Sequence, residues 1–123
     1  MEINEEVVTI NGIEYVKKSD LTQGASMQDG MKYVIVRTYS AGVFAGLIEI
    51  RNGQEVVMRN ARRIWYWDGA ASLSQMAVEG VKKPENCKFA MAVDRVELLQ
   101  AIEILDCTDK ARKCIESVSI WKQ

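Results

Sequence analysis

The sequence predicts an α+β fold: a small antiparallel β-sheet domain built from hairpins, with one main helix and a short C-terminal helix. Two Asn-Gly dipeptides, at Asn11-Gly12 and Asn52-Gly53, each lie between alternating apolar runs, which is typical of two-residue β-hairpins. A clear helical period of apolar residues follows Asp68. The chain has 123 residues, of which 48% are hydrophobic, and this length fits one compact domain.

The first hairpin is expected near the amino terminus. Residues 7–10 pair across Asn11-Gly12 with residues 13–16. Residues 17–30 are rich in Gly, Ser and Asp, so we expect a loop or linker holding at most one helical turn. The chain therefore divides into an N-terminal hairpin and linker, residues 1–30, and a ligand-binding α+β domain, residues 31–123, which together form one compact domain.

The second hairpin supplies the centre of the predicted sheet. A strand over residues 32–37 ends at Arg37, on the face that carries Tyr33. Residues 44–51 then pair across Asn52-Gly53 with a strand that begins at residue 54 and continues to about Tyr66.

The register of this hairpin separates two neighbouring arginines. An unbroken strand puts Arg63 and Trp65 on the face of Phe44, and puts Met58 and Arg62 on the opposite face. Only one of the two arginines can therefore share a surface with Trp65. For each of them, three interpretations are open: a solvated edge, a carboxylate partner, or a contact to phosphate.

The C-terminal half supplies the helices. Ser72 and Gln75 form a capping-box pattern, and the helix that follows should end at Gly80. Residues 88–93 are expected to form a strand. Residues 95–105 suit a helix or a strand, and we favour a strand because a short helix then begins near Thr108. A last short strand is expected over residues 118–121.

Composition favours binding over catalysis. The 16 basic and 17 acidic residues give a net charge of −1, which provides no overall attraction to nucleic acid. There is no histidine, and neither paired carboxylates nor a nucleophile is arranged for catalysis. The three cysteines lack CxxC spacing, so we expect reduced thiols, no metal site and no cofactor. The acidic amino terminus and the lack of a long apolar run predict a cytosolic protein without membrane contact.

Candidate binding residues gather in the middle of the chain. Small residues in the turn after residue 38 would let backbone N–H groups approach a phosphate, although an ordinary loop fits as well. The aromatic run 65–67 suits either core packing with a subunit interface or base stacking. For Phe89, burial in the core and stacking on a base are equally open interpretations. The candidate ligand-binding residues are Arg37, Tyr39, Ser40, Ala41, Gly42, Val43, Phe44, Arg63, Trp65, Phe89 and Arg112.

Four segments resemble the phage-encoded Thoeris anti-defence proteins of the first described type, the sponges. They are VIVRTYSAGVFAG at residues 34–46, NARRIWYWDGAASLSQMAVEGV at 60–81, CKF at 87–89 and EILDCT at 103–108. The resemblance implies a homodimer or higher homo-oligomer in the cytoplasm of the infected bacterium. It also implies that the protein sequesters a cyclic ADP-ribose signal, glycocyclic ADP-ribose, without cleaving it.

A second hypothesis belongs to a different class. The chain could be a phage protein–protein interaction or virion-accessory protein, whose arginines and tryptophans form a protein interface. A sponge releases intact nucleotide when it is heated after incubation with the signal, whereas an interface protein releases none.

Overall fold

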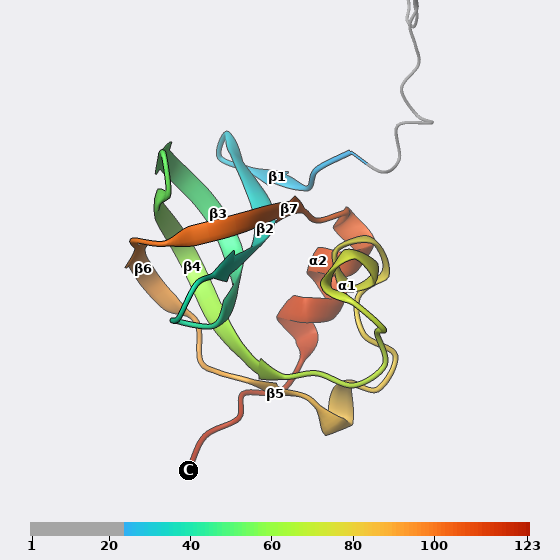
Figure 1. Cartoon of the computed structure of the whole chain (residues 1–123). Helices are drawn as coiled ribbons and strands as arrows, with labels where there is room; N and C mark the ends of the chain where they lie inside the picture. Colours follow the sequence, from blue (N-terminus) through green and yellow to red (C-terminus); the bar gives the residue numbers. More distant parts are fainter. Residues whose placement is uncertain (1–23) are drawn as a thin grey trace, which may run out of the picture.

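The computed structural model describes residues 24–123, which form a seven-stranded antiparallel sheet with two α-helices (Figure 1). The predicted α+β class is confirmed, and the hairpin expected over residues 7–16 lies outside the described residues. The strands follow the order β1-β2-β3-β4-β5, while β6 pairs with β4 and β7 pairs with β2. The elements are β1 (Met27–Gln28), β2 (Met31–Thr38), β3 (Val43–Asn52), β4 (Glu55–Tyr66), α1 (Leu73–Glu79), a 3-10 turn (Pro84–Asn86), β5 (Lys88–Phe89), β6 (Val93–Leu98), β7 (Ala101–Asp106) and α2 (Asp109–Ser117).

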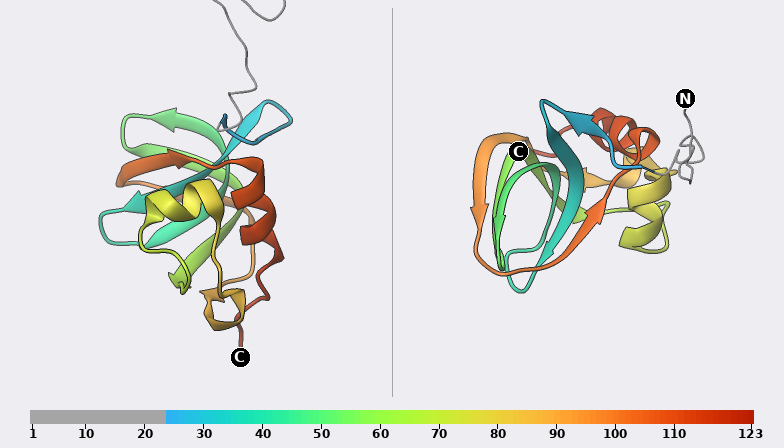
Figure 2. Two further views of the ribbon diagram at one scale, coloured as in Figure 1. Left: turned by 90° about the vertical axis from the view of Figure 1, so that its right-hand side faces the viewer. Right: turned by 90° about the horizontal axis from the view of Figure 1, so that it is seen from above.

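The sheet curls round on itself, with both helices packed outside one wall (Figure 2). The interior of the curl holds one apolar cluster, which includes Val36 and Phe44. A second cluster fills the space between the sheet and the helices, and includes Ile35, Met76 and Phe89. Because side chains alternate along a strand, β2 supplies both clusters from one run of apolar residues.

The predicted hairpin of β3 and β4 is present, but its turn is displaced by one residue. Asn52 pairs with Glu55, so Gly53 and Gln54 form the two-residue loop instead of Asn52 and Gly53. Gly53 has a φ of 64°. A hairpin turn with glycine at its first central position needs only that one positive φ, so Asn52 remains in the strand.

Two bulges, one in each strand, interrupt this hairpin. Between the pairings of Ala45 and Leu47, β4 carries one extra residue, and Asn60 in this segment has a φ of 50°. Between the pairings of Ile48 and Ile50, β3 carries the extra residue. Such insertions shift the register locally and strengthen the twist that closes the sheet.

The predicted register is therefore wrong between the bulges and right beyond them. Met58 pairs with Ile48 and joins the interior cluster of Phe44, instead of facing away from it. Beyond the bulges Phe44 pairs with Arg63. The predicted separation of Arg62 from Arg63 is thus confirmed.

Arg62 ties the sheet to α2 and β5. Its side chain is buried, with only 6% of the residue exposed, and burial lowers the pKa of its guanidinium. Within residues 24–123 it makes no ion pair with a carboxylate; carbonyl oxygens accept all of its hydrogen bonds. These oxygens belong to Ala90 (2.9 Å from Nε), Ile115 and Val118 (3.0 and 2.9 Å from Nη1) and Phe89 (3.1 Å from Nη2).

The helix α1 begins and ends as predicted. The Ser72 hydroxyl accepts a hydrogen bond from the Gln75 backbone N–H at 3.1 Å, and the Gln75 side chain accepts one from Ala71 N–H at 2.8 Å. The helix ends at Gly80, whose φ of 80° suits glycine. A Cβ at this position would also lie 2.7 Å from the sulfur of Cys114, so glycine allows α2 to pack closely.

Several C-terminal expectations need correction. The strand expected over 88–93 is limited to β5, because the chain then leaves β4 and returns as β6. The preference for strand in the ambiguous segment is confirmed by β6 and β7. The C-terminal helix α2 has nine residues and α1 only seven, so α1 is not the main helix. The strand expected over 118–121 is a single bridge between Ile120 and Phe89.

The described part of the expected linker belongs to the sheet. Residues of β1 pair with β2, and Ser26 N–H donates to the carbonyl of Cys107 at 2.7 Å. Residues 27–30 therefore form the first strand and the turn of a hairpin with β2, which is the first hairpin in the described part of the chain. No helix in the described region is both long and apolar enough to cross a membrane.

We predict that Arg62→Ala lowers the free energy of unfolding by about 3–5 kcal/mol, because it leaves buried carbonyl groups without donors. The matched control is Arg59→Ala on the same strand, where an exposed guanidinium pairs with Glu49 and little change is expected. Urea unfolding followed by circular dichroism measures both. Equal midpoints for the two variants would contradict the role of Arg62.

Candidate functional site

The most distinctive side chain is Arg63, which lies where β4 approaches its end. Its guanidinium carbon is 4.7 Å from the ring centre of Phe44 and 5.5 Å from that of Trp65. Phe44 is 4% exposed, whereas Trp65 is 58% exposed. The arginine therefore runs from the interior cluster to the surface between two aromatic rings, in contacts that favour a cation.

Arg63 has no protein acceptor for its buried Nε atom. Leaving a buried donor without an acceptor costs about 1–3 kcal/mol. Within residues 24–123 the other arginines are all engaged: Arg37, Arg59, Arg95 and Arg112 pair with carboxylates, and Arg51 and Arg62 donate to carbonyls. Because Nε is buried, an anionic ligand would bind the terminal nitrogens of this guanidinium, which has no acceptor in the described part of the chain.

The turn over residues 39–42 lies directly against Arg63. Gly42 has a φ of 97°, and a Cβ added there would be 4.0 Å from both Cδ and Nε of Arg63. Thr38 closes this turn, because its hydroxyl donates to the Gly42 carbonyl at 2.7 Å and accepts from Ala41 N–H at 2.9 Å. Sequence reasoning missed Thr38, whose hydroxyl gave no motif by itself.

The turn offers fewer free amides than the sequence suggested. The N–H of Ala41 is used by Thr38, and the N–H of Tyr39 donates to the Gln100 carbonyl at 2.9 Å. Among the turn residues, the amides of Ser40 and Gly42 have no acceptor in the described part of the chain. A phosphate could therefore receive two amides here, beside the guanidinium.

The structure does not bring Arg37 together with Arg63. Arg37 pairs across the sheet with Val43, so it faces away from the surface shared by Phe44 and Arg63. Its Nε atom donates to Glu103 at 2.9 Å, and both side chains are partly exposed. Any contact of Arg37 with a phosphate would have to compete with this carboxylate.

Arg112 also lies apart from the cluster around Arg63. It belongs to α2, where its Nε atom is 3.1 Å from a Glu116 oxygen and its guanidinium carbon is 5.1 Å from the Tyr33 ring centre. It also contacts Ser26 and Gln28. These contacts hold β1 against α2, which is a structural role.

The stacking role considered for Phe89 is wrong in this structure. The residue is 0% exposed, and its strand turns the ring into the cluster beneath the helices. The guanidinium carbon of Arg62 lies 5.4 Å from the ring centre. The core interpretation therefore holds, and no face of the ring is open to a base.

Two further residues near Trp65 were missed by the sequence reasoning. The Trp121 ring centre lies 6.2 Å from that of Trp65, with 68° between the ring planes. Lys88 Nζ is 5.5 Å from the Trp121 ring centre. Because Trp65 and Trp121 are far apart in sequence, no local pattern could have indicated this contact.

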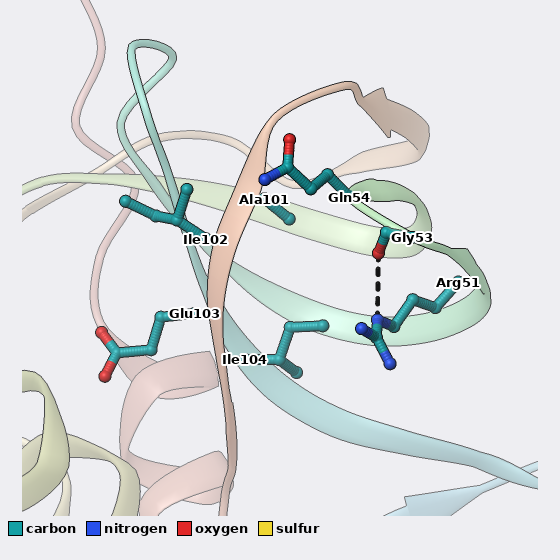
Figure 3. Close-up of a pocket in the computed structure, with 7 residues that line it drawn as sticks. All are labelled: Arg51, Gly53, Gln54, Ala101, Ile102, Glu103 and Ile104. Atoms are coloured by element: carbon teal, nitrogen blue, oxygen red, sulfur yellow. Dashed lines mark hydrogen bonds between the residues drawn. The ribbon is translucent and has the colours of Figure 1, made fainter.

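A separate hollow of about 580 Å³ lies between the β3–β4 hairpin and β7 (Figure 3). The Nε atom of Arg51 is directed at the carbonyl of Gly53, 3.1 Å away, so this donor is already used. Of the predicted binding residues none lines the hollow, whose lining consists of Arg51, Gly53, Gln54, Ala101, Ile102, Glu103 and Ile104.

The cysteines are free thiols, as predicted. Burial raises the pKa of the Cys107 thiol to about 12, so this group is not a nucleophile near neutral pH. Within the described range, no group of three or more His, Cys, Asp and Glu residues is placed to hold a metal ion.

Residues 31–115 match the model of a protein family described as a domain of unknown function (DUF6948). The chain belongs to this family. No curated protein and no solved structure matches the chain. The DUF6948 match begins at the first residue of β2 and ends within α2, so it includes Phe44, Arg63 and Trp65 but not Trp121.

We predict that Phe89→Ala lowers the free energy of unfolding by about 3–5 kcal/mol, because a fully buried ring is lost. Trp65→Ala removes a larger but exposed ring from the next strand and should change stability far less. Thermal and urea unfolding of both variants provide the comparison. An unchanged midpoint for Phe89→Ala would restore the alternative in which this ring is available to a ligand.

Proposed function

We propose that the protein is a phage anti-defence sponge that binds and sequesters glycocyclic ADP-ribose without cleaving it, and thereby blocks Thoeris-type immunity in the cytoplasm of the infected bacterium. Its ligand combines a diphosphate, an adenine and riboses. The observation that carries the proposal is the state of Arg63, which is held between two aromatic rings with a buried Nε atom that has no acceptor.

Arg63 is suited to a diphosphate by both shape and setting. A guanidinium fork donates two parallel hydrogen bonds to phosphate oxygens. The rings of Phe44 and Trp65 hold the side chain in place, so little of its conformational freedom remains to be lost on binding. The amides of Ser40 and Gly42 add uncharged donors beside it.

The contact free energies reach what sequestration requires at the upper end of their range. Nanomolar binding corresponds to about −12 kcal/mol. Two or three charge-assisted phosphate contacts at about 1.5–3 kcal/mol each, with base stacking at about 1–3 kcal/mol, supply much of this free energy. Binding without turnover fits the surroundings of Arg63, since aromatic rings and a glycine turn offer no general base.

The direct test is recovery of the ligand. The protein is incubated with glycocyclic ADP-ribose, freed of unbound nucleotide by filtration, and heated; the supernatant is then analysed by chromatography. A sponge releases the intact nucleotide. A changed product would indicate an enzyme, and the absence of any nucleotide would favour the protein-interaction alternative.

Arg63→Ala should weaken binding of glycocyclic ADP-ribose roughly tenfold to hundredfold, as expected when a charge-assisted contact is lost. Arg95→Ala is the matched control, because Arg95 pairs with Glu97 on β6. Arg37→Ala tests whether Arg37 also contacts the phosphates. A loss of affinity as large as that of Arg63→Ala would mean that Arg37 leaves Glu103 and binds the ligand. Calorimetric affinity equal to wild type for folded Arg63→Ala would refute the proposed site.

We further propose that the protein is a homodimer or higher homo-oligomer, with its ligand sites beside the interface. The apolar side chains exposed near the site favour this, since aromatic residues and Met are enriched in interfaces. They are Tyr66, Met91 and Ile120. Sedimentation should give a mass above that of one 13.9 kDa chain. A stable monomer, with and without ligand, would contradict the prediction.

A further inference from the structure

The contacts around Arg63 continue into a row of aromatic rings and cations. The row runs from the buried ring of Phe44, through Arg63 and Trp65, to Trp121 and finally Lys88, with the separations given above. It connects the interior of the curled sheet with the C-terminal segment. The second half of the row has no assigned role.

The backbone around Trp121 is anchored while its indole is left at the surface. The backbone N–H of Trp121 donates to the carbonyl of Phe89 at 2.9 Å, and Ile120 forms a β-bridge with Phe89. Phe89 itself is fully buried, so the segment is attached to the core. Trp121 as a whole residue is nevertheless 40% exposed, and it belongs to neither core cluster.

The two indoles form a corner at the surface, since both residues are partly exposed. Their planes meet at 68°, so a flat group stacked on one ring turns its own edge toward the other ring, which is a favourable aromatic geometry. Arg63 lies against Trp65 on one side, and Lys88 lies against Trp121 on the other. Within the described residues Lys88 forms no ion pair with a carboxylate, so its charge is available.

We propose that the corner between Trp65 and Trp121 is a subsite for a purine base, and that Lys88 provides a second cation for the phosphates attached to it. This inference rests on the proposed function and specifies how the same site would recognise its ligand. A nucleotide with a flat base and a diphosphate matches a pair of rings flanked by two cations. An anion without a base would use the cations only.

The test compares a ligand that has the base with one that lacks it. Glycocyclic ADP-ribose and pyrophosphate are titrated into wild type, Trp121→Ala, Trp121→Phe and Lys88→Gln. Leu99→Ala is the control, since this exposed side chain lies in the turn between β6 and β7. Sedimentation of each variant shows whether the assembly is kept.

Trp121→Ala should weaken binding of glycocyclic ADP-ribose roughly 5- to 100-fold and leave pyrophosphate binding unchanged, while Trp121→Phe keeps most of the affinity. Lys88→Gln should weaken both ligands. Unchanged affinity in folded Trp121→Ala would overturn the subsite and leave the sponge intact. Equal losses for both ligands, or a loss explained by a smaller assembly, would also overturn it. Failure of wild type to bind glycocyclic ADP-ribose would instead remove the proposed function, and the subsite with it.

Discussion

The fold depends on the buried guanidinium of Arg62. A cation without a carboxylate is stable in the interior only if several oriented dipoles replace its water. Here the carbonyls of β5, of the end of α2 and of the segment after it serve this purpose, and the negative end of a helix dipole suits the charge. The requirement to satisfy all these donors at once fixes β5, the helix end and the C-terminal segment relative to β4. It thereby also fixes the place where Trp121 emerges.

The next residue, Arg63, carries the same guanidinium group, but its Nε atom has no acceptor in the described part of the chain. Because side chains alternate along β4, Arg62 enters the cluster beneath the helices and Arg63 joins Phe44 on the other face. One arginine finds its acceptors within the protein, and the other is held between rings with a donor unused. The same strand thus provides the structural attachment and the candidate binding group. A substitution of Arg62 therefore tests the stability of the fold, whereas a substitution of Arg63 tests ligand binding.

Local signals predicted the local features. The capping box at Ser72, the stop at Gly80 and the hairpin of β3 and β4 each depend on neighbouring residues, and each was recognised in the sequence. The burial of Phe89 and the acceptors of Arg62 could not be recognised, because they are set by contacts between distant segments. For the site, the sequence indicated Arg63 with Trp65 but not Thr38, Lys88 or Trp121. The hydrogen bonds and ring contacts of these residues exist only after the sheet has curled.

The two bulges of the hairpin have an arithmetic consequence. Each adds a single residue, one to β3 and one to β4, so each reverses which side chains oppose one another and the pair of insertions cancels. Loss of one bulge with its extra residue retained would exchange Arg62 and Arg63 relative to Phe44, and would direct the wrong cation at the carbonyls near α2. Deletion of the extra residue together with its bulge would leave Arg63 opposite Phe44. In the strands of this hairpin, a related chain should therefore lose a single residue only at a bulge, and single deletions elsewhere should be found only where the two arginine positions have changed as well.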